Sequence, residues 1–370
     1  MASGNQNIGT GRLIALDAFR GFTIAAMIMV NYPGSWSHVY PPLLHEAWHG
    51  ITPTDLIYPF FIFIVGVSIV LAYNKRLEAG LPRKDMYTKI ISRSIKIFAV
   101  GIFLNLFPSF DFESLRIAGV LQRIALVFAA CAFLYLAAGW KAQAWTGAGI
   151  LIFYWLAMTL IPTPGYGKPM LEPGVNLAAW IDQFLLPGKM WQGTWDPEGI
   201  FSTFPAIVTG ISGMLAGKLI IKSSSTERAI MWLFALGFFS TILGEMWGWI
   251  FPINKNIWTS SYVLYTSGLA AMTLAAAMFF IDLLNYRRGT SFGIIYGANA
   301  ITAYVLAGIL SSLFYRIPFW GLSLNRHFVS GLSEIGLEPK LASLMYALIF
   351  VAVIFLPVYI LYKKKIFIKL

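Results

Sequence analysis

Residues 54–73 read TDLIYPFFIFIVGVSIVLAY, and this stretch decides the fold class. Asp55 is its only charged residue, and the run is long enough to cross a hydrocarbon layer of roughly 30 Å as one α-helix. The sequence therefore predicts an all-α polytopic membrane protein with about ten transmembrane helices, organised as a single domain over residues 1–370. The other apolar runs lie at 13–32, 89–108, 115–138, 142–161, 199–221, 229–251, 258–282, 292–315 and 341–362.

The composition also indicates a membrane protein. Charged residues make up 12% of the 370 residues and hydrophobic residues 58%, whereas about 25% of a soluble domain is charged. The runs 258–282 and 292–315 are rich in Gly and Ala, which favours close helix packing in lipid. Cys131 is the only cysteine, so no internal disulfide is expected.

The net charge of +11 is explained by the position of the basic residues relative to the membrane, and no nucleic-acid partner is expected. With ten spans, 18 of the 27 Lys and Arg residues fall on the side that holds both termini. Cytoplasmic loops carry the excess of Lys and Arg, so both termini are expected in the cytoplasm. The long loops 32–53 and 162–198 are then on the outer side. The other basic residues are Lys168, Lys189, Lys255, Arg316, Arg326 and Lys340 on the outer side, and Arg20, Arg116 and Arg123 within spans.

Three of the four histidines, His38, His45 and His49, lie in the outer loop 32–53, which contains no Lys or Arg. Histidine titrates near neutral pH, so this cluster points to proton-transfer chemistry. His45 and His49 are four residues apart and could share one helical face, a weak zinc pattern. No third ligand in an HExxH-type arrangement accompanies them, and no metal is expected.

Ionisable residues inside apolar runs are costly, which makes each a candidate for function. Asp17 and Arg20 are spaced to form an ion pair on one helical face, and they interrupt the first run, which is expected to remain as a helix rather than a cleaved signal. Arg116 and Arg123 are two turns apart on the expected fourth helix. Arg123 is deep enough to need an anionic partner, which is Asp17, Asp55 or a ligand phosphate.

Asp55 opens the second expected helix, and two roles are open to it. It can cap the helix N-terminus, or it can orient a nearby histidine through the second ring nitrogen. In the outer loop 162–198, Trp180, Trp191 and Trp195 can either stack on a sugar ring or anchor the chain at the membrane interface.

Several short blocks of this sequence resemble the heparan-α-glucosaminide N-acetyltransferase family, in the family's own order. That family consists of polytopic enzymes that move acetyl from cytosolic acetyl-CoA to a terminal glucosamine amine across the membrane. The blocks are RL at 12–13, DAFRG at 17–21, VNY at 30–32, HEAWHG at 45–50, DLIYPFFIF at 55–63, GVLQR at 119–123, DPEG at 196–199, PINKNIW at 252–258, GAN at 297–299 and YKKKIF at 362–367.

The resemblance implies that His45 is the catalytic residue and that Asn31 belongs to the active site. His45 would act either as the base that deprotonates the acceptor amine or as a covalent acetyl carrier. Asn31 would donate a hydrogen bond to the thioester oxyanion, a contribution of about 3–4 kcal/mol in comparable sites. Asp55 would fix the histidine tautomer. The expected donor contacts are Arg123, Gln122, Asn299 and Tyr304, and the expected acceptor contacts are Glu198, Asn254 and Trp258.

The likeness also implies a minimal bacterial relative in the inner membrane, without the lumenal domain that precedes this region in animal members. Its expected co-substrate is acetyl-CoA and its expected partners are an amino-sugar acceptor and the lipid bilayer, while family likeness suggests a homodimer. Two other functions stay open. One is a secondary transporter of an amino sugar, although residues 1–180 and 190–370 show no convincing repeat of the kind many transporters have. The other is an O-acyltransferase that modifies a cell-envelope glycan.

Overall fold

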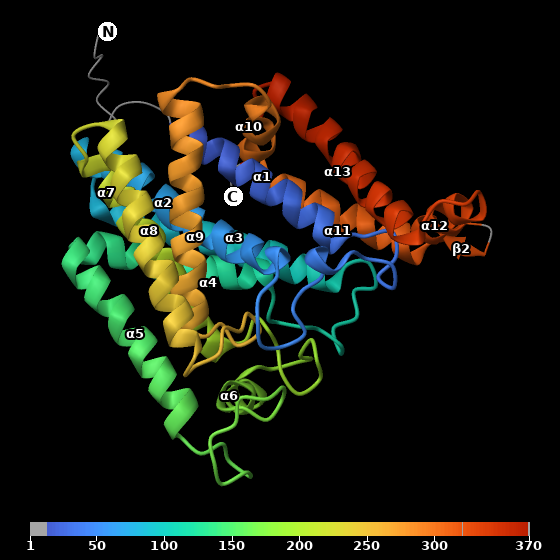
Figure 1. Cartoon of the computed structure of the whole chain (residues 1–370), viewed down its shortest axis with the longest axis horizontal. Coiled ribbons are helices and arrows are strands. Elements are labelled where there is room, and N and C mark those ends of the chain that lie inside the picture. Colours follow the sequence, from blue (N-terminus) through green and yellow to red (C-terminus); the bar gives the residue numbers. More distant parts are fainter. Residues whose placement is uncertain (1–12, 320, 369–370) are drawn as a thin grey trace.

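The computed structural model of the chain describes residues 13–319 and 321–368, whose regular secondary structure is almost entirely helical (Figure 1). Arg12 and Lys369, two of the basic residues assigned above to the side of the termini, lie outside the described residues. The α-helices are α1 (Ile14–Asn31), α2 (Ile57–Glu78), α3 (Arg83–Leu106), α4 (Val120–Ala137), α5 (Trp140–Leu160), α6 (Leu177–Leu185), α7 (Ile200–Lys222), α8 (Thr226–Gly248), α9 (Ser260–Ala277), α10 (Thr290–Ala298), α11 (Ala300–Arg316), α12 (Leu324–Glu334) and α13 (Pro339–Lys363).

The remaining elements are short. Two 3-10 turns, Pro41–Leu43 and Pro53–Leu56, lie in the loop between α1 and α2, and a π-helical turn, Met278–Leu283, continues α9. Strand β1 (Pro318–Phe319) pairs antiparallel with β2 (Leu322–Ser323), the only sheet in the described chain.

Eight helices are long and apolar enough to cross a membrane, which confirms the all-α polytopic fold. They are α1, α2 with the turn before it, α4, α5, α7, α8, α9 with its π-helical turn, and α13. Each of the ten expected runs corresponds to helix, but two of them differ from a simple span. Helix α3 has 24 residues and is less apolar, because Lys89, Arg93 and Lys96 lie within it.

The run 292–315 is wrong as one straight span. It forms α10 and α11, which meet at Asn299 with a bend of 81° and together would make a ninth crossing. Asn299 has non-helical dihedral angles (φ −129°, ψ 43°), and its side chain bonds the C-terminal segment instead of continuing the helix. The break is therefore fixed by a tertiary contact that the run itself does not contain.

Glycines allow α1 and α10 to approach each other closely. A Cβ atom at Gly21 of α1 would lie only 1.7 Å from the carbonyl oxygen of Gly293, and one at Gly297 would lie 2.3 Å from the carbonyl oxygen of Asp17. In α9, a Cβ at Gly268 would lie 2.4 Å from the carbonyl oxygen of Gly237 in α8. The prediction of close packing through the small residues of both runs is confirmed.

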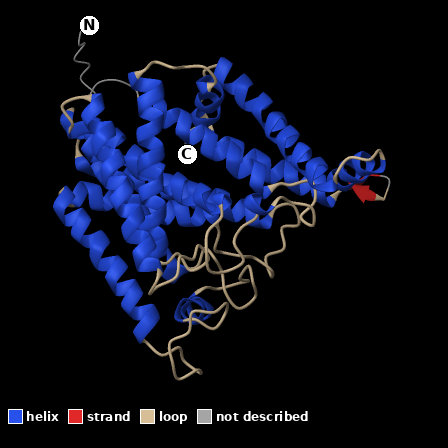
Figure 2. Ribbon diagram, in the orientation of Figure 1, coloured by secondary structure: helices blue, strands red, loops and turns tan. Residues whose placement is uncertain are grey.

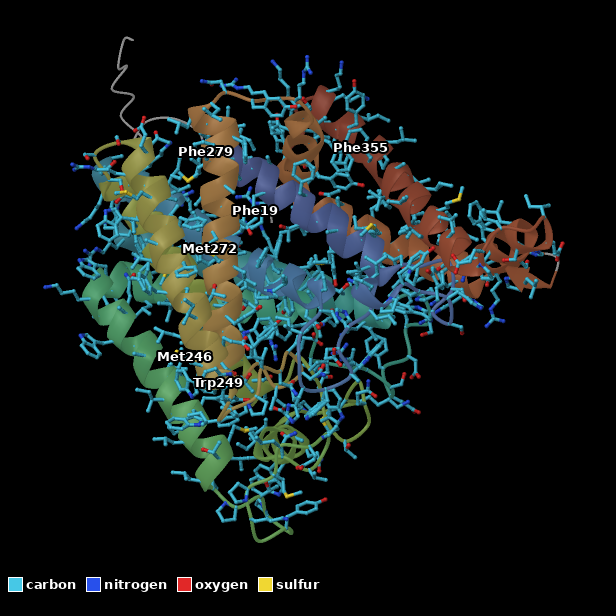
Figure 3. The ribbon with its side chains drawn as sticks, viewed as in Figure 1. Phe19, Met246, Trp249, Met272, Phe279 and Phe355 are labelled. Atoms are coloured by element: carbon cyan, nitrogen blue, oxygen red, sulfur yellow. The ribbon has the colours of Figure 1, made fainter. Side chains whose placement is uncertain are left out.

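Long loops gather at one end of the bundle, which we call the loop end (Figure 2). The loops that meet there are 32–56, 107–119, 161–199 and 249–259. At the opposite, terminal end, Leu13 and Ile368 line one cavity, so the two ends of the described chain lie on the same side of the bundle. Met246 and Trp249, both exposed, lie near the loop end of α8, and Phe279 lies near the other end of the α8–α9 pair (Figure 3).

Candidate active site

Asp55 organises the start of α2 and the loop before it. It lies in the Pro53–Leu56 turn with its side chain 1% exposed. Its Oδ2 accepts hydrogen bonds from the backbone N–H of Glu46 at 3.0 Å and of Thr52 at 3.1 Å, and Thr52 completes a capping box with it. Its Oδ1 faces the Nδ1 of His45 at 2.7 Å. The capping and the hydrogen bond to histidine, considered above as alternatives, are thus both present.

The hydrogen bond to Asp55 decides which nitrogen of His45 is available for chemistry. A carboxylate accepts, so the Nδ1 of the neutral ring carries the hydrogen and Nε2 keeps its lone pair. The His45 side chain is 43% exposed at the loop end. This arrangement of a buried carboxylate, an imidazole and an accessible Nε2 is that of a general base or a nucleophile.

Lys255, which sequence reasoning left without a role, lies against the same ring. Its Nζ is 2.9 Å from His45 Nδ1, 3.2 Å from His45 Nε2 and 3.4 Å from Asp55 Oδ1. Burial lowers the pKa of Lys255, and the nearby carboxylates of Asp55 and Glu198 oppose this shift. The site is therefore a cluster of carboxylate, imidazole and amine, which we call the His45 cluster (His45, Asp55 and Lys255).

The loop 249–259 holds Lys255 through a compact turn. The backbone N–H of Asn254 donates to Thr259 Oγ1 at 3.0 Å, and its Oδ1 accepts from the backbone N–H of Ile257 at 3.2 Å. Trp258 adopts a φ of +51° and donates from Nε1 to Thr209 Oγ1 at 3.2 Å. Asn254 and Trp258 are fully buried, so they shape the wall beneath the cluster, and their direct contact with an acceptor stays a prediction.

The expectation that His45 and His49 share a helical face is wrong, because residues 44–52 are not helical. The loop is held instead by tertiary bonds, which turn the two rings toward different partners. His49 Nδ1 lies 3.3 Å from Asn254 Nδ2, and burial lowers the pKa of His49. His38 Nδ1 lies 3.1 Å from Ser35 Oγ. Within residues 13–319 and 321–368, no three His, Cys, Asp or Glu residues are grouped to hold a metal.

Arg116 was expected on the fourth helix and is found in the loop before it. Helix α4 begins only at Val120, because the backbone around Arg116 is extended and bridges to Gly188 of the loop 161–199. Its guanidinium bonds Asp196 through Nε at 2.7 Å and Nη2 at 2.6 Å, and it also pairs with Glu198. Burial lowers the pKa of Arg116, but the two carboxylates outweigh it and raise the pKa.

Trp191 covers this second group, and Glu198 is the more exposed of its two carboxylates. The Trp191 ring lies 5.0 Å from the Arg116 guanidinium and is exposed, while the Glu198 side chain is 10% exposed. A second ring contact joins the loops themselves, because Trp48 meets Trp195 edge-on at 5.0 Å. The loops 32–56 and 161–199 therefore form one surface at the loop end, with the His45 cluster and Glu198 among its residues.

Arg123 is fully buried, and neither Asp17 nor Asp55 is its partner, so those two expected pairings are wrong. Its Nη2 donates to the carbonyl of Gly199 at 3.1 Å and to Ser202, and the guanidinium lies 5.1 Å from the Trp258 ring. Its Nε and Nη1 bond to none of the described residues. Because unpaired buried donors are costly, the remaining alternative, a contact with a ligand, gains support.

The other predicted site residues are placed apart from one another. Gln122 is buried beside Gly101 and Gly119, and its Nε2 lacks a partner among the described residues. The Asn299 amide donates from Nδ2 to the carbonyl of Ile366 and accepts at Oδ1 from the backbone N–H of Ile368. Tyr304 lies on α11 within electrostatic range of Glu198 and Arg116. Asn31 ends α1 half-buried, and among the described residues no hydrogen bond joins it to His45.

A cavity of about 580 Å³ lies between α1, α2, α4 and α11 at the terminal end. Its mouth carries Arg20, Lys75, Arg76 and Arg93, and the predicted pair of Asp17 and Arg20 is confirmed there at 3.4 Å. Its inner walls are mainly apolar and include Phe61, Leu121 and Ile301. From Lys75 to Phe61 the cavity follows α2 for about 21 Å at 1.5 Å per residue. Its inner end is thus six residues from Asp55.

A family model described as the catalytic region of heparan-α-glucosaminide N-acetyltransferase matches residues 12–245, more than half of the chain. The chain belongs to this family. The mouse heparan-α-glucosaminide N-acetyltransferase is 29% identical over 420 residues, an alignment that covers 97% of this chain and 60% of the mouse protein. The human protein is 30% identical with the same coverage. The chain spans about 60% of the length of these curated relatives.

Membership in the heparan-α-glucosaminide N-acetyltransferase family confirms the resemblance seen in the sequence and makes this chain a multi-pass membrane protein of an N-acetyltransferase family. Lys255 was missed, although one signal pointed to it. It is a lone basic residue between Asn254 and Asn256, in a short loop at the end of the bundle that has few Lys and Arg residues. No pattern in the sequence indicated that Arg116 pairs with Asp196 and Glu198, because these partners lie 80 and 82 positions away along the chain.

Proposed function

We propose that this chain transfers an acetyl group from acetyl-CoA, bound at the terminal end, to the amine of a glucosamine-type sugar at the loop end. The observation that carries the proposal is the hydrogen bond of 2.7 Å between His45 Nδ1 and the buried Asp55. It leaves Nε2 available at the loop end, while a cavity with basic residues lies at the terminal end and reaches along α2 as far as Phe61, six residues from Asp55. The excess of Lys and Arg at the terminal end supports a cytoplasmic position for it, and by family likeness we propose the inner membrane of a bacterium.

The cavity suits the chemistry of coenzyme A. Phosphate groups favour Arg and Lys, which line the mouth as Arg20, Lys75, Arg76 and Arg93. The pantetheine arm is long and narrow, and the apolar walls leading past Leu121 would hold it in an extended form. The thioester would then approach the His45 cluster from the side of the terminal end. Arg123 and Gln122 do not line this cavity, but their buried N–H groups lack partners among the described residues, and we propose that they meet the polar groups of the arm beyond its inner end.

The chemistry would proceed as follows when His45 acts as a base. The acceptor ammonium donates a hydrogen bond to Nε2 and gives up a proton there. The free amine attacks the thioester carbonyl carbon, a new C–N bond forms, and the C–S bond breaks; the leaving thiolate takes the proton that His45 held and departs as the CoA thiol. His45 then accepts the second proton from the nitrogen of the new amide and releases it to water at the loop end. Asp55 stabilises the imidazolium that forms meanwhile. Asn31 makes no side-chain hydrogen bond to the described residues, and its amide is our candidate donor to the oxyanion.

Glu198 is our candidate for binding the acceptor. Its carboxylate is the more exposed of the two that pair with Arg116, and it lies within electrostatic range of Lys255. A carboxylate there would attract a protonated amino sugar and hold it beside His45. We assign Asn254 and Trp258 to the support of this surface, because both are buried. By family likeness we also propose a homodimer.

The decisive experiment uses purified protein with acetyl-CoA and glucosamine, and mass spectrometry of the soluble product. N-acetylglucosamine should form with wild-type protein and fall to background with His45→Ala. His38→Ala is the matched control, because His38 is in the same loop and bonds only Ser35 among the described residues. Turnover by His45→Ala close to the wild-type rate, with both variants folded, would remove His45 from the reaction. An acetyl ester instead of an amide would favour the O-acyltransferase.

One observation favours the transporter as a second candidate. The bend of 81° between α10 and α11 makes a broken helix next to the cavity, and such helices form substrate sites in many transporters. In proteoliposomes, a transporter would accumulate labelled glucosamine without acetyl-CoA. An acetyltransferase would release N-acetylglucosamine only when acetyl-CoA is present on the side of the cavity mouth.

A further inference from the structure

The amine of Lys255 occupies the position in which the proposed reaction needs the amine of the acceptor. An acceptor ammonium must reach hydrogen-bond distance of His45 Nε2, close to Asp55 and next to the incoming thioester. Lys255 Nζ already lies against the His45 ring, 2.9 Å from Nδ1 and 3.2 Å from Nε2, and 3.4 Å from Asp55 Oδ1, so that a rotation of the lysine side chain brings it in line with the lone pair of Nε2. The protein therefore contains a primary amine that matches the acceptor in charge, in chemistry and in its contact with the catalytic base.

The surroundings of Lys255 favour its uncharged form more than water does. The side chain is 15% exposed, and burial lowers its pKa. The charged and titratable groups that face it are His45, Asp55, Glu198 and the guanidinium of Arg123. The two carboxylates keep a share of the amine protonated, while His45 can accept the proton when the amine reacts.

We propose that Lys255 is a self-acetylation site, modified when acetyl-CoA is bound and no amino sugar occupies the loop end. The inference rests on the proposed function, because the same thioester and the same base are used. The Lys255 ammonium loses a proton to His45 Nε2. Its nitrogen then attacks the acetyl carbonyl carbon, a C–N bond forms and the C–S bond breaks. CoA leaves as the thiol with the proton that His45 held, His45 takes the second proton from the lysine nitrogen and passes it to water, and the product is Nε-acetyl-lysine.

Self-acetylation would switch the site off. The acetylated nitrogen carries no charge, so its ion pair with Asp55 is lost. The added acetyl group would also fill the space beside Nε2 that the acceptor needs. The acceptor would protect the enzyme, because a bound amino sugar displaces Lys255 from His45 and takes the acetyl group itself. The modification would couple the active fraction of the enzyme to the supply of acceptor.

The test is peptide mass spectrometry of the full-length protein after incubation with acetyl-CoA alone. We expect one acetyl group on the peptide that contains Lys255, and suppression of at least tenfold when glucosamine is present. His45→Ala should reduce Lys255 acetylation at least tenfold. Lys168, an exposed lysine in the loop 161–199, serves as the internal control, because its slow uncatalysed acetylation should be the same in all samples.

The outcomes separate this inference from the proposed function. N-acetylglucosamine formation by wild-type protein whose Lys255 is never acetylated would overturn the inference and leave the proposed function intact. Equal acetylation of Lys255 in wild type and His45→Ala, or no protection by glucosamine, would show uncatalysed chemistry and also overturn it. If neither product forms, both proposals are wrong. Lys255→Arg, which keeps the charge, should give an unmodified peptide and so confirms the site assignment.

Discussion

Oδ1 of Asp55 lies 2.7 Å from His45 Nδ1 and 3.4 Å from Lys255 Nζ, so one carboxylate oxygen holds two residues that are 210 positions apart in the chain. The same side chain caps the turn that leads into α2. The loops 32–56 and 249–259 consequently share one buried anchor. A change at Asp55 should therefore alter the chemistry of the ring and the packing of both loops together.

Asp55→Asn should separate these two effects. The amide keeps the size of the side chain and one acceptor oxygen for the turn, but it removes the charge that fixes the His45 tautomer and stabilises the imidazolium. We expect kcat for N-acetylglucosamine formation to fall by about 10³- to 10⁴-fold, as for the corresponding change in a Ser-His-Asp triad. The midpoint of thermal unfolding in detergent should fall only slightly.

Asp111→Asn is the control for Asp55→Asn. Asp111 also accepts backbone hydrogen bonds in a loop at the loop end, from Glu113 and Ser114, but it contacts no member of the His45 cluster among the described residues. Its kcat should equal that of the wild type. A loss of activity in Asp55→Asn that is matched by global unfolding would argue against a role in tautomer control.

Arg93→Gln tests whether the basic cavity binds the donor. Arg93 lines the cavity mouth, and its guanidinium lies 4.8 Å from the Phe128 ring. A hydrogen bond to a charged group contributes roughly 1.5–3 kcal/mol, so KM for acetyl-CoA should rise by about 10-fold or more while KM for glucosamine stays the same. Lys96→Gln removes the same charge from α3 outside the cavity and should leave both constants unchanged. Equal effects of the two substitutions would reject the assignment.

Gly21→Ala tests the close contact between α1 and α10. The new Cβ would lie 1.7 Å from the carbonyl oxygen of Gly293, a distance that only backbone movement can relieve. We expect a loss of about 1–3 kcal/mol, the usual cost of overpacking, seen as a lower unfolding midpoint. Gly149→Ala in α5 meets no atom within 4 Å and should be neutral or slightly stabilising. Two variants of equal stability would show that α1 and α10 are not packed this closely.

Asp182 should make stability depend on pH. It accepts hydrogen bonds from the backbone N–H groups of Ile200 and Phe201 at the start of α7, yet burial outweighs these bonds and raises its pKa from 3.8 to about 6. Between these values the folded state holds a proton that the unfolded state has released, so stability falls as pH rises. The full loss, about 3 kcal/mol at 1.36 kcal/mol per pKa unit, is present above pH 6.

Asp182→Asn should remove this dependence. The unfolding midpoint of the variant relative to wild type should rise from pH 4 to pH 7 and then level off. Thermal unfolding at a series of pH values measures the difference directly. Parallel curves for the two proteins would mean that Asp182 titrates normally in the folded state.

Local patterns in the sequence predicted most of the helices. An apolar run of membrane length is a property of consecutive residues, and so is the spacing that pairs Asp17 with Arg20. The glycines that bring α1 and α10 together were visible as composition, although their partners were not. These features require no knowledge of how distant segments meet.

The errors share one physical cause, which is contact between distant segments. Arg116 is beside an apolar run, but bonds to Asp196 and to Gly188 hold it in an extended loop. The break at Asn299 depends on the C-terminal segment. The position of Lys255 beside His45 depends on how two loops fold over α2. The spacing of apolar residues gives information only about neighbours along the chain. It therefore could not predict the position of Arg116, the break at Asn299 or the position of Lys255.

Hydrogen bonds join Asn299 to Ile366 and Ile368 near the end of the described chain. Ile368 also lines the cavity of about 580 Å³, so these bonds fix one side of that cavity. The C-terminal segment up to Ile368 is therefore held in place and forms part of the cavity lining. Substitutions or appended groups in this region should change the rates at which the proposed coenzyme A ligand enters and leaves the cavity, although none of these residues belongs to the His45 cluster.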